Sequence, residues 1–557
     1  MLHHHFLTWQ PAAHRMLVNM VNAVQDGRLM LFLGAPEFTS WLQDDAAHTL
    51  MNLGSRLGAR ATRGEAWVFA VHKGHAQAYE TLITSRNSTA SDVSPLMFST
   101  TIPLSSEKRC AWYQEPPLAT KATFCETYEG YNDFCHCHHP LHLHPHTAPL
   151  MKMEEVIPIA LVTAKRFPMV VRQVRQLWEN PGGRQTPLAL LVDGYDPQAE
   201  ALARLLNLTV TFHDNPVPRG TKHRVNQHIK FSLQTIFQLY PEVDKAIILE
   251  DDLSLAPDFV SYFQQTASLM NVDKTVLCVN AYSYNAFPHT ASDPRRIYRV
   301  QSYPYYGWMT SRTHAHKMLS NWAPLDIDAD WDLYSRQNHV DQTHEVIIPE
   351  VPRTRHEGGA GLHVTNLEQE ITFDQRPLNT LPNVKLNVHR HWHHAYAQDR
   401  TLDIRQATVV TITRHPCVVA PVPRYQKNTT YVIYMNHTRN EDKEISYKVL
   451  AKCLGFYHQN LYENYRQTFS IKFFETPIIL VACWSSAYWR APTTGLCDCV
   501  PDGVIYQPTT GDLQYAEKHP WRHSNASTEI TWRVPPHTPE EEFRLNNVRS
   551  LHVVINE

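Results

Sequence analysis

The chain has almost no net charge. Its 557 residues carry 51 Lys and Arg against 54 Asp and Glu, a formal charge of −3 at pH 7. Without an excess of one sign, no net field favours nucleic acid or an acidic membrane surface, and we expect no nucleic-acid partner. Hydrophobic residues make up 43% of the chain and charged residues 19%, which is typical of a globular rather than a disordered protein.

The N-terminal segment lacks a long apolar run. Residues 1–20 read MLHHHFLTWQPAAHRMLVNM, which holds neither a signal peptide nor the ~20 apolar residues of a membrane-spanning helix. Either the protein is cytosolic, or its natural start lies upstream of this sequence. Ten cysteines and five Asn-X-Ser/Thr sequons favour the lumen of the secretory pathway. The sequons lie at Asn87, Asn207, Asn428, Asn436 and Asn525.

Residues 106–150 lack apolar periodicity and are rich in Cys, His and Pro. The cysteines here are Cys110, Cys125, Cys135 and Cys137. A connector without its own core usually needs covalent staples, so we expect disulfides. Cys135, Cys137 and the neighbouring histidines could instead bind a structural metal. The paired CxxC spacing of zinc modules is absent, however.

The length predicts several domains, because single hydrophobic cores stop growing at roughly 250–300 residues. We expect an N-terminal segment (1–27), a small β-rich stem domain (28–105), the connector (106–150), an α/β domain (151–400) and a C-terminal region (401–557). In the stem, the apolar runs at 29–33 and 66–71 predict strands. The periodic segment 46–57 predicts a helix that stops at Gly58. In the C-terminal region, YVIYM and PIILVAC predict strands, and a helix is expected after the first of them.

From about residue 155, apolar runs of strand length alternate with amphipathic helical patterns. Strands are predicted at 157–164, 188–194, 208–214 and 244–252, and helices at 168–180, from 197, at 224–240 and at 257–270. Such alternation predicts an open, largely parallel sheet covered by helices. Ligands of these sheets bind beyond the carboxyl ends of the strands.

The strongest chemical signal lies where the fourth of these strands ends. IIL runs directly into Glu250, Asp251 and Asp252. Adjacent carboxylates repel one another, and a hard divalent cation relieves that cost while binding a substrate diphosphate. Arg166 and Asp193 follow two other strands at the same edge, where they could contact phosphate and a nucleotide base or ribose. Taken singly, each of these features could equally be a solvated turn.

The residues 250–263, EDDLSLAPDFVSYF, resemble the metal-binding strand end and following helix of the β-1,2-N-acetylglucosaminyltransferases that act on mannose. Further similar stretches fall in the order found in that family: LVDGYD at 191–196, VNQHIKFSL at 225–233, IYRV at 297–300, YYGW at 305–308, DWD at 330–332 and IIPEVPRT at 347–354. Within the family, FCETYEGYNDFCHC at 124–137 and the stem are most similar to the protein O-linked-mannose enzymes. The resemblance covers roughly residues 28–480.

This resemblance implies a GT-A fold, UDP-N-acetylglucosamine as the donor, Mn²⁺ as the cofactor and a mannosylated glycoprotein as the acceptor. It also implies a membrane anchor and the lumen of the Golgi, so we expect the natural start to lie upstream. By position, Asp252 would ligate Mn²⁺ and Asp332 would be the catalytic base. The implied donor-binding residues are Arg166, Asp193, His228, Glu250, Asp251 and Trp331. Without the resemblance, His228 would be read as a histidine on a helix face.

Several positions depart from the family pattern and bear on the acceptor. The stretch VNAYSYNA at 279–286 replaces a usual Ser-Ala-Trp-Asn-Asp, and Tyr305 stands where Gly is common. Tyr334-Ser335 replaces Trp-Met, Val346 replaces a cysteine that would pair with Cys278, and His363 stands in the phosphate-capping loop.

Three functions therefore stay open: transfer to O-linked mannose, the same transfer to mannose of N-glycans, and a catalytically inactive lectin-like protein. Trp67 of the stem is a candidate sugar-binding aromatic, and otherwise a core tryptophan of its strand.

Overall fold

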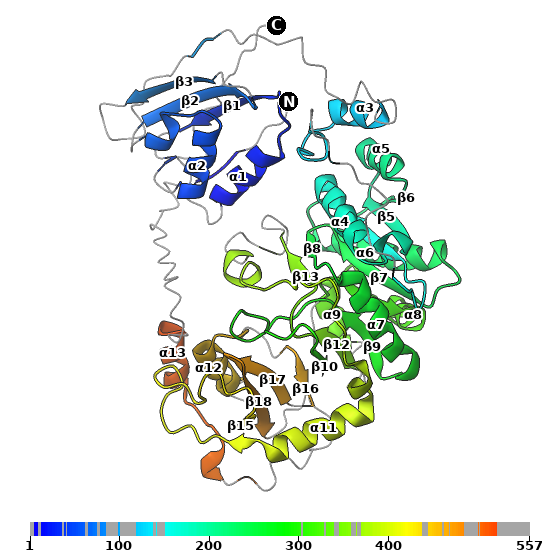
Figure 1. The fold of residues 1–557 in the computed structure, drawn as a ribbon, viewed down its shortest axis with the longest axis vertical. Helices are drawn as coiled ribbons and strands as arrows, with labels where there is room; N and C mark the ends of the chain where they lie inside the picture. The colour runs from blue at the N-terminus through cyan, green and yellow to red at the C-terminus, as the bar shows by residue number, and fades with distance from the viewer. Residues whose placement is uncertain are drawn as a thin grey trace.

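In a computed structural model, the described residues form three larger sheets in succession along the chain and one two-stranded sheet (Figure 1). The described residues are 5–8, 13–35, 38–39, 42–61, 65–74, 78–84, 98–100, 119–136, 141, 151–301, 305–327, 330–338, 345–357, 364, 369–436, 444–458, 462–466, 468–483, 500 and 502–520. Cys110, Cys137, His363 and the sequons at Asn87 and Asn525 lie outside them.

The N-terminal sheet is antiparallel, with β1 (Leu29–Gly34), β2 (Glu65–His72) and β3 (Ala78–Thr84) in sequence order. Two helices, α1 (Ala13–Ala23) and α2 (Asp44–Asn52), pack on it. Both predicted strands are confirmed. The predicted helix ends earlier than expected, because the chain turns at Gly54, whose φ of +104° suits glycine, and Gly58 opens a short 3₁₀ turn. Trp67 is 3% exposed and stacks on Phe38, so the core interpretation of this residue is confirmed.

The connector contains α3 (Ala119–Thr127) and a disulfide between Cys125 and Cys135. The expectation of a disulfide is therefore confirmed for these two cysteines. Their side chains are buried against Phe124 and Phe134.

The central sheet has eight strands in the order β10-β12-β9-β11-β7-β4-β5-β6. Their bounds are β4 Ile159–Thr163, β5 Leu188–Asp193, β6 Thr209–His213, β7 Lys245–Glu250, β9 Val276–Asn280, β10 Ile297–Val300, β11 Trp308–Ser311 and β12 Glu345–Pro349. The pairings from β6 through β7 and between β9 and β12 are parallel, and the other three are antiparallel. The predicted α/β class with a largely parallel sheet is confirmed.

Helices cover both faces of this sheet. Ile159 and Leu161 of β4 face a core with α4 (Phe167–Glu179), α5 (Pro197–Leu206) and α7 (Phe259–Val272). Ala160 and Val162 face the opposite core with α6 (Lys222–Leu239), α8 (Arg312–Ser320) and α9 (Trp331–Asn338). The continuous apolar strands follow from this burial on two faces. In the sheet, Val346 lies opposite the buried Cys278, at the position where the family pattern has a cysteine.

The C-terminal region forms a five-stranded sheet in the order β14-β15-β18-β17-β16. Its strands are β14 Thr408–Val409, β15 Tyr431–Asn436, β16 Asn464–Tyr465, β17 Thr468–Phe473 and β18 Thr476–Cys483. Its helices are α11 (His393–Gln406), α12 (Ile445–Leu454) and α13 (Thr510–Lys518), and a disulfide joins Cys417 to Cys453. The two predicted strands and the helix after the first are confirmed as β15, β18 and α12.

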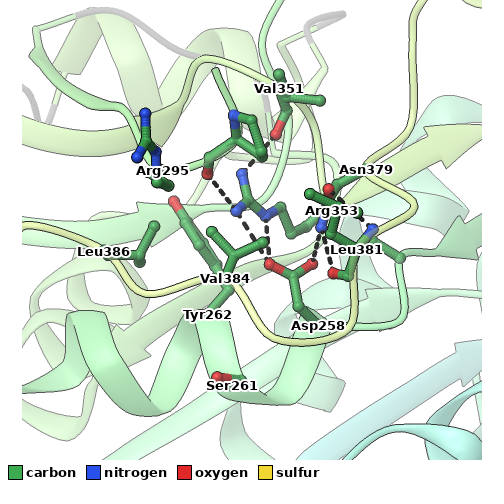
Figure 2. A network of polar contacts seen from close by, with 12 residues as sticks. Asp258, Ser261, Tyr262, Arg295, Val351, Arg353, Asn379, Leu381, Val384 and Leu386 are labelled. Carbon is green, nitrogen blue, oxygen red and sulfur yellow. Dashed lines mark hydrogen bonds and ion pairs between the residues drawn. The ribbon is translucent and has the colours of Figure 1, made fainter. Parts of the chain in front are cut away.

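A buried ion pair joins two segments of the α/β domain that are distant in the sequence. Arg353 donates to Asp258 at 3.0 Å, and Asn379 donates to the other oxygen of this carboxylate at 2.7 Å (Figure 2). The Arg353 guanidinium also lies over the ring of Tyr262. These contacts join the N-terminal end of α7 to the segment before β13 (Thr354–His356), which pairs with β8 (Leu253–Leu255).

Candidate active site

The acidic cluster lies at the carboxyl edge of the central sheet, as the sequence predicts. Glu250 is the last residue of β7, and Asp251 and Asp252 lead into β8. The backbone N–H of Asp251 donates to Val162 at 3.0 Å, and the Thr163 hydroxyl donates to its carboxylate at 2.6 Å. The end of β4 therefore fixes the position of the cluster.

The three carboxyl groups differ in charge. Burial, followed by the charges of Asp252, Asp251 and Asp332, raises the pKa of Glu250 well above its usual value. Burial and the charge of Asp252 raise the pKa of Asp251 to about 7. For Asp252, burial is outweighed by His356 and Arg166, and the pKa is lowered. Asp252 is therefore the most readily ionised carboxyl of the cluster.

Two cationic side chains contact the Asp252 carboxylate. Arg166, at the N-terminal end of α4, lies 3.2 Å from it, and His356 Nε2 lies 3.3 Å from the same oxygen. On its other side, His356 Nδ1 donates to Gln369 at 2.7 Å, and Gln369 donates to Asp374 at 2.8 Å. Because an amide oxygen only accepts, this contact keeps the proton on Nδ1 and directs Nε2 toward Asp252.

His356 was missed by the sequence interpretation. It follows IIPEVPRT, the stretch at 347–354 that resembles the family, by two positions. A histidine so close to a recognised stretch was the available signal. Its distance of 104 residues from Asp252 along the chain hid the contact, which depends on the pairing of β13 with β8.

A second cluster lies beyond β5 and β6. Arg224 of α6 donates to both oxygens of Asp193, at 2.6 and 3.0 Å, and Asn215 donates to one of them at 3.0 Å. The expected role of Asp193 as an acceptor for the nucleotide therefore competes with these contacts. His213 and His228 join this cluster, with their Nδ1 atoms 3.3 Å apart.

His228 is neutral and partly unsatisfied. Burial lowers its pKa to about 4, although the charge of Asp193 acts in the opposite direction. Its Nε2 atom is buried without a partner of good hydrogen-bond geometry, although the backbone of Leu191 and Thr163 lies close by, so a ligand group there would improve its contacts. Asp193, His213 and His228 have ligand atoms within 4.8 Å of one another. Because Arg224 already neutralises Asp193, a small polar ligand fits this cluster better than a cation.

The expected base and its neighbour open helix α9. The ring of Trp331 packs against those of Trp308 and Trp322, and its backbone N–H donates to the Asn226 side-chain oxygen at 3.0 Å. Asp332 is the next residue, and its charge is among the causes of the raised pKa of Glu250. The structure thus brings Asp332 within electrostatic reach of the acidic cluster.

These groups suit a bound cation and a diphosphate. The Asp252 carboxylate and, once its proton is lost, the Nε2 atom of His356 could present an oxygen and a nitrogen to one point, which fits a divalent first-row metal ion. Arg166 adds a guanidinium that can pair with phosphate. Asp332 provides a carboxylate for proton abstraction nearby.

Comparison with known proteins gives a family match and partial relatives. A family model described as the GNT-I family matches residues 146–460, more than half of the chain. An alpha-1,3-mannosyl-glycoprotein 2-beta-N-acetylglucosaminyltransferase from Arabidopsis thaliana is 29% identical over 217 residues, covering 37% of this chain and 48% of the relative. The chain therefore matches about half the length of this curated relative.

The similar solved structures include distant matches. The crystal structure of GalNAc-T7 with UDP, GalNAc and Mn²⁺ matches 36% of this chain and 43% of its own, with 10% identity and a TM-score of 0.26. A glycosyltransferase involved in glycosylation of the major capsid of PBCV-1 matches 39% of this chain and 100% of its own, with 9% identity and a TM-score of 0.22. At such TM-scores neither match carries an argument about chemistry.

Proposed function

Because this chain belongs to the GNT-I family, we propose that it transfers N-acetylglucosamine from UDP-N-acetylglucosamine to the 2-hydroxyl of a mannose on a glycoprotein. One observation carries the proposal. An ionised carboxylate, Asp252, lies in an acidic cluster at a strand end, and Asp332 lies within electrostatic reach of that cluster.

The donor is proposed to bind along the carboxyl edge of the sheet. Asp252 and His356 would hold Mn²⁺, which when bound neutralises the charge that develops on the leaving diphosphate. Arg166 would pair with a phosphate oxygen. The buried Nε2 of His228 supports a contact with the uracil base, because an acceptor group there would satisfy an otherwise orphaned atom. We propose that Glu250, Asp251 and Trp331 line the part of the site that binds the donor sugar and ribose.

The acceptor is proposed to be activated by Asp332. A carboxylate on the face opposite the leaving group takes the proton of the mannose 2-hydroxyl as that oxygen attacks the anomeric carbon. A single displacement of this kind inverts the configuration, by the logic known for inverting glycoside hydrolysis. The product would then be the β-linked disaccharide.

Two glycoprotein acceptors are candidates. The name of the Arabidopsis relative specifies an alpha-1,3-mannosyl glycoprotein, which favours mannose of that type, as in an N-glycan, over the O-linked mannose expected from the sequence. O-linked mannose is kept as the second candidate. The disulfide-bonded connector and the preceding N-terminal sheet are the features that support it.

A UDP-release assay with Mn²⁺ and a panel of acceptors tests the proposal. We expect release with an α-1,3-mannosyl N-glycan core, and higher turnover with a mannosyl-serine peptide would favour the second candidate. If no mannoside stimulates release above the rate of donor hydrolysis, the transferase proposal is wrong. Binding of sugars without turnover would then favour a lectin-like protein.

We also propose that the protein works in the lumen of the Golgi. The disulfides Cys125–Cys135 and Cys417–Cys453 support an oxidising compartment. Among the described residues, no helix has the length and apolar composition needed to cross a membrane.

A further inference from the structure

Tyrosines gather beside the acidic cluster, on loops that follow strands of the central sheet. Tyr284 follows β9, and Tyr306 precedes β11. Their ring centroids lie 6.1 Å apart in an edge-to-face arrangement, and both side chains are partly exposed. Tyr284 belongs to the stretch 279–286, where this sequence departs most clearly from the family pattern.

The C-terminal region extends this group of rings. Tyr457 and Tyr462 lie 4.5 and 5.0 Å from the ring of Tyr284, and 5.5 Å from each other with nearly parallel planes. Tyr462 is partly exposed, whereas Tyr457 is buried. Residues from two regions of the chain thus build one aromatic surface, Tyr284, Tyr306 and Tyr462.

A buried carboxylate holds the loop that carries Tyr284. Glu463 accepts hydrogen bonds from the Ser283 hydroxyl and from the backbone N–H groups of Tyr284 and Asn285. Its own backbone has a φ of +66°, a strained conformation for a residue with a side chain. Such strain persists only where surrounding contacts fix the backbone. The three hydrogen bonds to Glu463 hold the loop of Tyr284 against the C-terminal region.

The surface lies next to the expected chemistry. The ring of Tyr306 is 5.7 Å from that of His356, which contacts Asp252. Burial raises the pKa of the Tyr306 hydroxyl, and the charges of Asp332 and Glu250 raise it further, so this hydroxyl is within electrostatic reach of both carboxylates. The aromatic surface extends from Tyr306 through Tyr284 to Tyr462, away from the acidic cluster.

We propose that Tyr284, Tyr306 and Tyr462 form an acceptor subsite, in which Tyr462 binds the sugar or peptide unit that adjoins the acceptor mannose. The proposal rests on the transferase function proposed above. Tyrosine offers an apolar ring face to the C–H face of a pyranose and a hydroxyl to its polar rim. Few rotatable bonds and the contacts of Glu463 keep the ordering cost low. Acceptor choice would thus depend on the C-terminal region as well as on the central sheet.

The experiment compares full-length wild type with Tyr462→Ala, Tyr462→Phe and Tyr515→Ala. Tyr515 is the matched control, because it also lies in the C-terminal region, on α13, but packs on His415 instead of Tyr284. Initial rates are measured with methyl α-mannoside and with an extended mannosyl acceptor, at saturating Mn²⁺ and varied UDP-N-acetylglucosamine. Saturation-transfer NMR with the extended acceptor, UDP and Mn²⁺ reports binding without turnover.

We expect Tyr462→Ala to raise the KM of the extended acceptor about tenfold, with KM for methyl α-mannoside and for the donor unchanged. Tyr462→Phe keeps the ring but loses the hydroxyl, so its KM should lie between those of wild type and Tyr462→Ala, and the saturation-transfer signal of the extended acceptor should weaken most in the alanine variant. If Tyr462→Ala matches Tyr515→Ala with both acceptors, or changes donor and acceptor KM alike, the subsite is wrong although the transferase stands. If wild type neither turns over nor binds any mannoside, both proposals fail.

Discussion

Asp252 carries a different charge from its two acidic neighbours because of what each side chain touches. Arg166 and His356 stabilise its ionised form, whereas burial favours the protonated forms of Glu250 and Asp251 by raising their pKa values. A divalent cation would bind the charged carboxylate of Asp252, and its charge would favour the loss of protons from Glu250 and Asp251. The sequence alone shows three acids in a row and cannot rank them, because the two cations arrive from segments about 90 residues before and 100 residues after the cluster.

Asp332→Asn tests the proposed base. The amide keeps the shape of the side chain but cannot take a proton, so we expect kcat to fall about 10²–10⁴-fold. Affinity for UDP, measured by calorimetry with Mn²⁺, should stay within twofold of wild type. Asp330→Asn, two residues earlier in the same acidic segment, is the control and should keep most activity. Equal losses in both variants would argue against a specific role of Asp332.

At the scale of helices and strands, the region 155–270 was predictable because its signals are local. The strands β4, β5 and β7 contain continuous apolar runs, and the helices show a 3.6-residue period. Helix α6 begins at Lys222, two residues before the expected start, because the Thr221 hydroxyl caps it. The order of β9 to β12 was not predictable, since it depends on pairings between distant segments such as β11 with β7.

The same limit applied to the site. Glu250, Asp252 and Asp332 are candidates from the sequence because they lie in recognisable stretches. Arg224, which occupies Asp193, and Glu463, which holds Tyr284, were not identified. Their contacts join elements whose packing no local pattern encodes.

Arg353→Met tests the ion pair that joins α7 to the segment before β13. It leaves the carboxylate of Asp258, 1% exposed, without its cation, and we expect a loss of about 3–5 kcal/mol in unfolding free energy. Urea denaturation followed by circular dichroism provides the measurement. Arg295→Met, at an exposed arginine near the same network (Figure 2), should change stability by less than about 1 kcal/mol. If both variants unfold at the same urea concentration, the buried pair does not stabilise this junction.

Glu80 gives the N-terminal sheet a dependence on pH. Although burial opposes it, hydrogen bonds from Ser55 and from backbone N–H groups at 56–58 lower the pKa of this carboxyl below its ordinary 4.5. A lowered pKa means that the stabilisation is complete above pH 4.5 and is lost as the pH falls through the folded-state value.

Glu80→Gln should therefore destabilise the N-terminal sheet by about 2 kcal/mol at pH 7 and remove its acid sensitivity. Hydrogen exchange of the peptide containing residues 55–58, measured between pH 3 and 7 with correction for the intrinsic exchange rate, reports this change. Glu200→Gln, at an exposed pair with Arg204, is the matched control and should retain the wild-type profile. A profile for Glu80→Gln as steep as that of wild type would contradict the assignment.

At the scale of the whole molecule, three regions meet around one edge of the central sheet. Arg15 of α1 pairs with Asp374, which is linked through Gln369 and His356 to Asp252. From the other side, the C-terminal region supplies Glu463 and Tyr462. The acidic cluster is thus supported by polar contacts from segments outside the α/β unit. We expect the N-terminal and C-terminal regions to influence the use of the acceptor.

The central claim is that Asp252 holds a divalent ion against the diphosphate of a sugar nucleotide, within reach of Asp332. The most direct measurement is calorimetric titration of Mn²⁺ into the UDP complex of wild type and of Asp252→Asn, followed by UDP release with a mannosyl acceptor. The account predicts that the variant loses at least tenfold in Mn²⁺ affinity and about 10²-fold or more in turnover. Wild-type Mn²⁺ affinity together with wild-type turnover in Asp252→Asn would contradict it.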